Sequence, residues 1–217
     1  MYQHLSILLA SLFCFGSLAA AGPINFDVTV DTSSIFSTAG SLDFNFNPGP
    51  METQLASLKI LDFTSNGLLG GGPALTGDVA GTLPGTLAFD NATGFNDYFE
   101  GFTFGNTLSF ELSFYGPALS APNGASTSGS TFAFSMFSDA AGTIPALTSD
   151  TTNGFAFTVN VNLDGTTTVT NSSAQITVAQ SAGASPEPGT LPPMLLALSL
   201  VLWYCARLRR RGTAGPS

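Results

Sequence analysis

The central part of this 217-residue chain, residues 22–185, lacks the side chains that most enzymes and metal sites use. It contains no cysteine, histidine, tryptophan or arginine, because these residues are confined to the two ends of the chain. Without cysteine this part folds without disulfide bonds, and without histidine it also lacks the usual ligands of zinc and redox metals. A Ser-His-Asp triad and a thiol nucleophile are excluded for the same reason.

Basic residues are almost as scarce in this central part. Lys59 is its only base, whereas all 14 acidic residues of the chain lie between Asp27 and Glu187. The net charge of −9 for the whole chain understates this imbalance, because the arginines lie near the C-terminus. Such a surface repels the phosphate backbone, so we expect no nucleic-acid partner. It attracts divalent cations and basic partners instead.

Two kinds of chemistry stay open for a chain with this composition. The first is paired-carboxylate cleavage of a polysaccharide by a glycoside hydrolase or lyase, which needs two acids about 5–10 Å apart. Asp97, Glu100 and Glu111 lie in the aromatic, acidic stretch 95–114 and are the candidates for such a pair. Side chains on the wet face of a strand would show the same pattern, and we favour that interpretation, so no catalytic residue is assigned.

The second is calcium binding, since calcium prefers the hard oxygen ligands that this chain has in excess. The candidate ligands are Asp27, Asp31, Asp90 and Asp97. None of them lies in the spacing of an EF-hand loop. Calcium is therefore the only cofactor that we expect the chain could bind.

Apolar and polar residues alternate with a period of two, which predicts strands with one buried and one wet face. The alternation is clearest in residues 42–46, 108–114, 132–136 and 155–163. Further strands are expected at residues 24–30, 56–63, 77–83, 86–89, 98–104, 166–170 and 174–178. Asp164-Gly165 between two such runs predicts a hairpin with a two-residue type I′ turn.

Many short strands separated by turns predict an all-β fold, an antiparallel two-sheet sandwich of jelly-roll or Greek-key type. All of the chain's 19 phenylalanines except Phe13 and Phe15 lie in this part. Because tryptophan is absent, we expect phenylalanine to provide most of the bulk of the core.

The N-terminus has the pattern of a secretory signal peptide over residues 1–21. Residues 5–20 are mostly apolar, and Ala19 and Ala21 are small residues at the positions that signal peptidase requires before a cut at Gly22. A signal-peptide helix is therefore expected before the domain, and signal peptidase is an expected partner.

The C-terminus combines three features in a fixed order. Pro186, Glu187 and Pro188 come first, and an apolar run over residues 191–206 follows. That run, about 24 Å long as a helix, is short for the ~30 Å core of a bilayer, which favours a transient anchor over a permanent one. Four arginines close the chain: Arg207, Arg209, Arg210 and Arg211. Because positive charge stays in the cytoplasm, we expect the central part to lie outside it.

This ending resembles the PEP-CTERM sorting signal of Gram-negative bacteria. The resemblance implies recognition by exosortase, a membrane-embedded cysteine transpeptidase, removal of the tail near the motif, and release of the body or its attachment to exopolysaccharide. The alternative is a plain single-pass tail anchor. The body is similar to an ectodomain that recurs on PEP-CTERM proteins, in residues 28–33, 96–98 and 102–110. That likeness implies a surface or matrix role and supplies no active site.

The predicted organisation is a signal peptide over 1–21, a β-sandwich ectodomain over 22–178, a flexible linker over 179–185, a sorting signal over 186–211 and a cytoplasmic tail over 212–217. The predicted function is that of an exported surface or extracellular-matrix protein, associated with biofilm exopolysaccharide and without catalytic activity. The alternatives are a carbohydrate- or calcium-binding module and a glycoside hydrolase or lyase. We expect a transient inner-membrane stage followed by a location at the cell surface or outside the cell.

Overall fold

The computed structural model describes residues 22–181, and these residues form strands with two short helical turns. The elements are β1 (Ile24–Asp31), η2 (Ser33–Ile35), β2 (Ala39–Pro48), β3 (Ser57–Ser65), β4 (Leu68–Leu69), β5 (Ala74–Thr76), β6 (Val79–Ala80), β7 (Leu87–Asp90), β8 (Asp97–Thr103), β9 (Thr107–Tyr115), α2 (Pro117–Ser120), β10 (Ser130–Phe137), β11 (Phe155–Val161), β12 (Thr167–Asn171) and β13 (Ile176–Gln180). The expected all-β class is confirmed.

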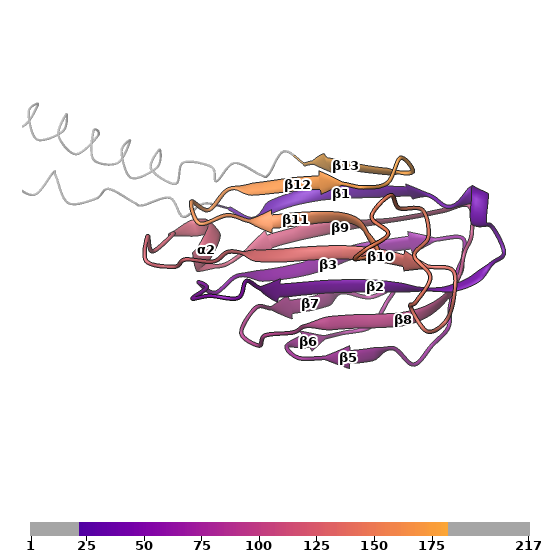
Figure 1. Cartoon of the computed structure of the whole chain (residues 1–217), viewed down its shortest axis with the longest axis horizontal. Coiled ribbons are helices and arrows are strands. Elements are labelled where there is room, and N and C mark those ends of the chain that lie inside the picture. The colour runs from indigo at the N-terminus through magenta and orange to yellow at the C-terminus, as the bar shows by residue number, and fades with distance from the viewer. Residues whose placement is uncertain (1–21, 182–217) are drawn as a thin grey trace, which may run out of the picture. The chain divides into compact units, whose positions relative to one another are not determined.

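The strands make two antiparallel sheets that lie face to face like the layers of a sandwich (Figure 1). The six-stranded sheet has the order β13-β1-β9-β3-β7-β6, and the seven-stranded sheet has the order β12-β11-β10-β2-β8-β4, with β5 also paired to β8. Neighbouring strands in each sheet are therefore often distant in sequence. This arrangement decides which outward-facing side chains become neighbours.

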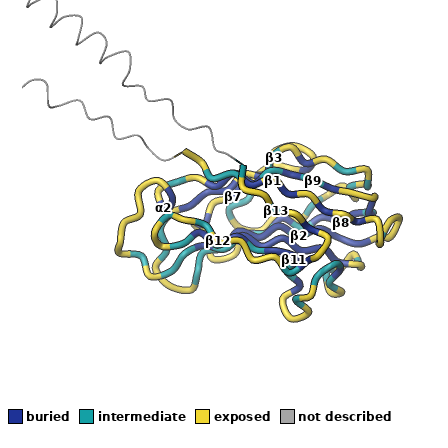
Figure 2. Tube along the Cα trace, turned by 90° about the horizontal axis from the view of Figure 1, so that it is seen from above, coloured by how far each residue is buried: buried dark blue, intermediate teal, exposed yellow. Residues whose placement is uncertain are grey.

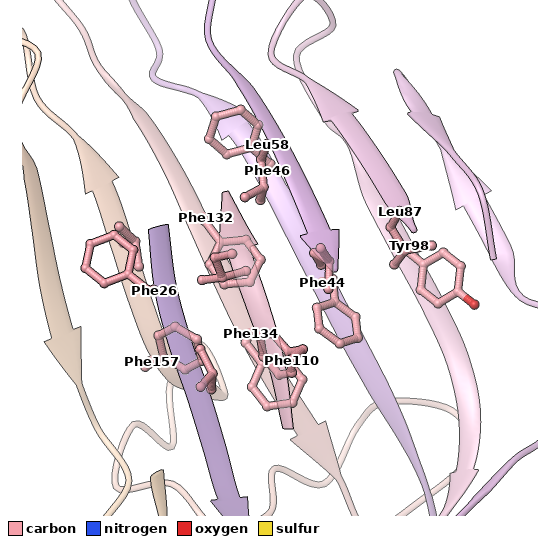
Figure 3. Close-up of a cluster of buried hydrophobic side chains, with 14 of the residues drawn as sticks. Phe26, Phe44, Phe46, Leu58, Leu87, Tyr98, Phe110, Phe132, Phe134 and Phe157 are labelled. Atoms are coloured by element: carbon pink, nitrogen blue, oxygen red, sulfur yellow. The ribbon is translucent and has the colours of Figure 1, made fainter. Parts of the chain in front are cut away.

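The predicted alternation places phenylalanine between the sheets. Phe110 on β9 lies with its ring centroid 5.4 Å from that of Phe44 and 5.2 Å from that of Phe134, both of which belong to the opposite sheet. Phe46 and Phe132 pack in the same way on Phe114, at 6.0 and 6.3 Å. Figure 3 shows several of these rings between the strands of the two sheets. A phenylalanine-filled core is thus confirmed.

Buried positions follow the strands, and exposed positions gather in the loops (Figure 2). The sandwich is completed by β13, whose last residue, Gln180, pairs with Phe26. The backbone N–H of Ser181 then donates to the carbonyl of Asn25 at 2.9 Å. The ordered pairing thus continues two residues beyond 178, into the segment expected to be a linker.

Some local predictions need correction. The strand expected over 77–83 is reduced to β6, because Gly77 and Gly81 adopt positive φ angles of 74° and 100° and end the extended conformation on either side. The short strands β4 and β5 were not predicted, since runs of two and three residues have no period to recognise.

The hairpin between β11 and β12 has a different turn from the one predicted. Gly165 has φ +81°, but Asp164 does not have a positive φ, so the type I′ assignment is wrong. The N–H of Gly165 donates to the carbonyl of Asn162 at 3.1 Å, and the N–H of Asn162 donates to that of Thr166 at 2.8 Å. This is a three-residue loop with glycine in the left-handed position. The Asp164 carboxylate stabilises it by accepting the N–H of Thr166 at 3.0 Å.

Candidate functional site

Most of the predicted processing residues lie outside the described residues. These are Ala19, Ala21, Pro186, Glu187, Pro188, Arg207, Arg209, Arg210 and Arg211, together with the apolar segments 5–20 and 191–206. Gly22 is the first described residue and is exposed. Among residues 22–181, no helix has the length and apolar character needed to cross a bilayer.

The three acids considered for catalysis do not form a pair. Asp97 and Glu100 are both on β8, but Asp97 faces outward whereas Glu100 faces the core and is 3% exposed. Glu100 accepts a hydrogen bond from the Tyr98 hydroxyl at 2.5 Å and one from the N–H of Gly71 at 3.1 Å. Glu111 is on β9 in the other sheet. The core position and the hydrogen bonds of Glu100 indicate a structural role.

The four acids considered for calcium are also separated. Asp27 and Asp31 are on β1, where Asp27 accepts the Ser181 hydroxyl at 2.6 Å and Asp31 accepts the N–H of Ser33 at 2.9 Å. Asp90 ends β7 and accepts the hydroxyl of Ser57. Asp97 lies in the other sheet. The four therefore cannot share one ion, and among residues 22–181 no three acidic side chains gather as a metal-binding group.

A hollow on the outer face of the seven-stranded sheet, lined by polar and apolar side chains, is a candidate site. Its volume is about 450 Å³, and it is lined by Asp43, Asn45, Asn47, Phe95, Asp97, Thr131, Ala133 and Phe155. These residues come from β2, β8, β10, the start of β11 and the loop before β8. The hollow thus joins segments that are far apart in the chain.

The register of β2 explains why polar groups meet there. Leu42, Phe44 and Phe46 enter the core, so the residues between them must face outward. Pairing with β8 then sets Asn45 directly opposite Asp97. Asp43 and Asp97 come close enough to share a hydrogen bond.

Burial makes this carboxyl pair electrostatically unusual. Desolvation, together with the hydrogen bond and the charge of Asp97, raises the pKa of Asp43 to about 9. Burial raises the pKa of Asp97 as well, although its hydrogen bond with Asp43 opposes that shift. At neutral pH the carboxyl of Asp43 is therefore protonated. The Nδ2 of Asn45 also donates to Oδ1 of Asp43, at 2.6 Å.

Several polar atoms around this pair lack a partner. Of the four buried polar side-chain atoms without a hydrogen bond in the described part of the chain, three are here: Oδ1 of Asn45, Oδ1 of Asp97 and Oγ of Ser135. Ser135 lies directly opposite Asp43 on β10 and is 1% exposed. Buried polar atoms are normally paired, and two of these atoms belong to residues that line the hollow, Asn45 and Asp97, which makes the hollow a candidate ligand site.

The loop from β10 to β11, residues 138–154, lies against the same outer face (Figure 1). The Ser41 hydroxyl on β2 donates to the carbonyl of Asp139 at 2.9 Å, and Gly142 lies against the ring of Phe99 on β8. This contact restricts access to one part of the sheet and leaves the hollow beside Phe155 accessible. Phe95, 54% exposed, provides an apolar side.

The sequence offered only part of this site. Asp97 is among the candidates from sequence, whereas the alternation over residues 42–46 marks Asp43 only as a polar residue on the wet face of its strand. Its role depends on the pairing of β2 with β8. The only local signal is the run Asp43, Asn45 and Asn47, which places three oxygen-bearing side chains on one face of one strand.

The geometry defines residues 22–181 as an all-β body of two antiparallel sheets, with a hollow on one outer face that contains two aspartates. Comparisons found no family model, no curated protein and no solved structure that matches the chain.

Proposed function

We propose that the protein is an exported surface or extracellular-matrix component of a Gram-negative bacterium, processed by exosortase and without catalytic activity. The observation that carries this proposal is the order of the C-terminal features. Pro186-Glu187-Pro188 precedes the apolar run 191–206, and the arginine cluster follows. The signal-peptide pattern at residues 1–21 supports the same route.

The non-enzymatic role is supported by the positions of the acids. Asp97 and Glu100 face opposite sides of one sheet, and Glu111 belongs to the other. Asp43 and Asp97 share a hydrogen bond, so their carboxyls lie closer together than the separation of about 5 Å or more that glycoside hydrolysis uses. A structural or binding role fits these residues better than hydrolysis.

The finer description of the fold as a jelly roll or Greek key is part of this proposal. It is supported by the path of the chain, which passes from one sheet to the other between β1 and β2, between β2 and β3, and again between β9 and β10. Such crossings are typical of sandwiches with this topology.

Intact mass spectrometry of the protein recovered from the membranes and medium of exosortase-containing cells tests the processing. We expect a mature chain that begins at Gly22 and ends close to Pro186–Pro188. A matched variant, Pro186→Ala with Pro188→Ala, keeps the apolar run and the arginines, and it should remain full-length in the membrane. Recovery of the wild-type chain with its arginines still attached would favour the tail-anchor alternative and contradict the proposal.

A second candidate function, carbohydrate binding, is favoured by the composition of the hollow. Sugars bind to sites that combine hydrogen-bonding side chains with an aromatic surface, and the hollow offers Asn47, Thr131 and the exposed Phe95. Glycan arrays with wild type and Phe95→Ala test this candidate. Binding that the substitution abolishes would support it, whereas absence of binding to exopolysaccharide fragments would exclude it.

A further inference from the structure

The outer face of the seven-stranded sheet gathers oxygen atoms without gathering positive charge. Asn45 lies directly opposite Asp97, and the Nδ2 of Asn45 donates to Asp43 at 2.6 Å. Lys59, the only Lys or Arg among the described residues, is in the other sheet, where its Nζ lies 5.6 Å from the centre of the Tyr115 ring. Within residues 22–181, therefore, no lysine or arginine balances these carboxyls.

The amide of Asn45 is the most informative group. This side chain is only 8% exposed, and its Oδ1 has no hydrogen-bond donor. Nδ2 is already bound to Asp43, so Oδ1 is the group of this hollow-lining residue that still lacks a partner. On the facing strand, Oδ1 of Asp97 is also buried without a donor. The proton of Asp43 can serve as a donor to Asp97, so Oδ1 of Asn45 is the acceptor that still needs a donor or a cation.

We propose that Asp43, Asn45 and Asp97 bind one calcium ion in this hollow. The site supplies the carboxyl of Asp97, the carboxyl of Asp43, which releases its proton when the ion binds, and an amide carbonyl. These are hard oxygen ligands and suit calcium better than softer metals. The volume of about 450 Å³ leaves room for the water molecules that complete a calcium shell. Calcium also tolerates irregular coordination better than magnesium, which demands near-ideal octahedral geometry. Side chains fixed on neighbouring strands can satisfy the irregular coordination of calcium more readily than the octahedral coordination of magnesium.

This site is distinct from the candidates that the sequence suggested, because only Asp97 is common to both sets. It also does not depend on export or processing. The ligands belong to the folded sheet, whereas processing depends on the ends of the chain. Calcium binding can therefore fail while processing succeeds, and processing can fail while calcium still binds. The two proposals are therefore tested separately.

Calorimetric titration of the full chain tests the inference. The protein is purified in detergent, stripped with a chelator and titrated with calcium chloride and, in parallel, with magnesium chloride. We expect one calcium ion per chain, with a dissociation constant on the order of 10⁻⁴–10⁻³ M, as in extracellular modules, and weaker binding of magnesium. Calcium should also raise the melting temperature, since it binds only the folded state.

The variants Asp97→Asn and Asn45→Leu should each weaken calcium binding by about tenfold or more. Asp31→Asn removes the same charge from an exposed acid on the other sheet and serves as the matched control. Far-UV circular dichroism in chelator checks that each variant is folded. If one ligand variant is unfolded, the other and the wild-type titration still decide the question.

The inference is overturned if the stripped wild-type chain shows no saturable calcium binding up to about tenfold above the expected dissociation constant. It is also overturned if Asp97→Asn and Asp31→Asn bind calcium equally well, because binding would then come from the general negative charge. Tighter binding of magnesium than of calcium would contradict the choice of ion.

Discussion

At the scale of single residues, the carboxyl of Asp43 is kept neutral by its surroundings. Burial and the neighbouring Asp97 raise its pKa to about 9, compared with 3.8 for a free aspartate. The facing residue on β10 is Ser135, which does not titrate, so Asp97 is the charged group that acts on it. The folded chain therefore holds a proton that the unfolded chain has already released at neutral pH.

This shift has a definite sign for stability. Between pH 3.8 and about 9 the folded state binds one proton more than the unfolded state at this position, so the free energy of unfolding falls as pH rises. Asp43→Asn removes the titrating group and should stabilise the protein by roughly 1–3 kcal/mol at pH 8 while changing little at pH 4. Thermal melts of the two proteins in chelator at both pH values measure the difference.

Asp31→Asn is the control, because the pKa of Asp31 is shifted in the opposite direction. Hydrogen bonds from Ser33 lower the pKa of Asp31, so its contribution to stability is present above pH 3.8 and is lost as pH falls. This substitution should destabilise the protein slightly at pH 8. If Asp43→Asn also destabilises the protein at pH 8, the buried carboxyl of Asp43 does not cost the folded state the free energy that its raised pKa implies.

At the scale of elements, the two sheets are held together by rings that reach across the core. Phe110 on the central strand β9 contacts Phe44 and Phe134 of the opposite sheet, at 5.4 and 5.2 Å between ring centroids. Phe110→Ala should therefore lower the free energy of unfolding by about 3–5 kcal/mol, because it leaves a cavity between the layers. Chemical denaturation of the full chain measures this loss.

Phe36→Ala is the matched control for that substitution. Phe36 is 54% exposed, so losing its ring should change stability by no more than about 0.5 kcal/mol. Equal losses for the two variants would mean that the core does not depend on contacts between the sheets.

The strands that could be predicted from sequence are those in which one face is buried. In β9 every second residue from Leu108 to Phe114 enters the core, and the same alternation marks β10 and β11. The strands β4 and β5 could not be predicted, because they are too short to show a period and contribute little to the core. Their pairing with β8 is decided by tertiary packing.

The candidate site was less predictable than the fold, for a physical reason. Outward-facing acids look alike in sequence, whether they stand in solvent or meet another acid. What distinguishes Asp43 from Asp27 is its surroundings. Asp43 is largely buried beside Asp97 of β8, whereas Asp27 lies opposite Glu111 on the exposed face of β1. Strand order and register are properties of the whole sandwich, so alternation alone could not reveal the pair.

At the scale of the whole molecule, charge is divided between the body and the C-terminus. All 14 acids precede residue 188, whereas four of the five basic residues follow residue 206. Because arginine-rich segments are retained in the cytoplasm, this division predicts that the acidic body is exported while the last residues stay inside. The acidic body also has little attraction for anionic lipid surfaces. Under the proposed topology, the C-terminal segment is then the main attachment to the membrane.

Reversing the charge at the C-terminus tests this topology. The four arginines at positions 207, 209, 210 and 211 are replaced together by glutamate, and a second variant replaces them by lysine. The glutamate variant should lose its fixed orientation, so that protease added outside the inner membrane reaches its C-terminus, whereas the lysine variant should behave as wild type because it keeps the positive charge. A protease-protection assay with a C-terminal epitope measures this difference. Equal protection of all three proteins would show that the arginines do not set the topology, and the sorting role of the basic cluster would then have to rest on recognition by exosortase alone.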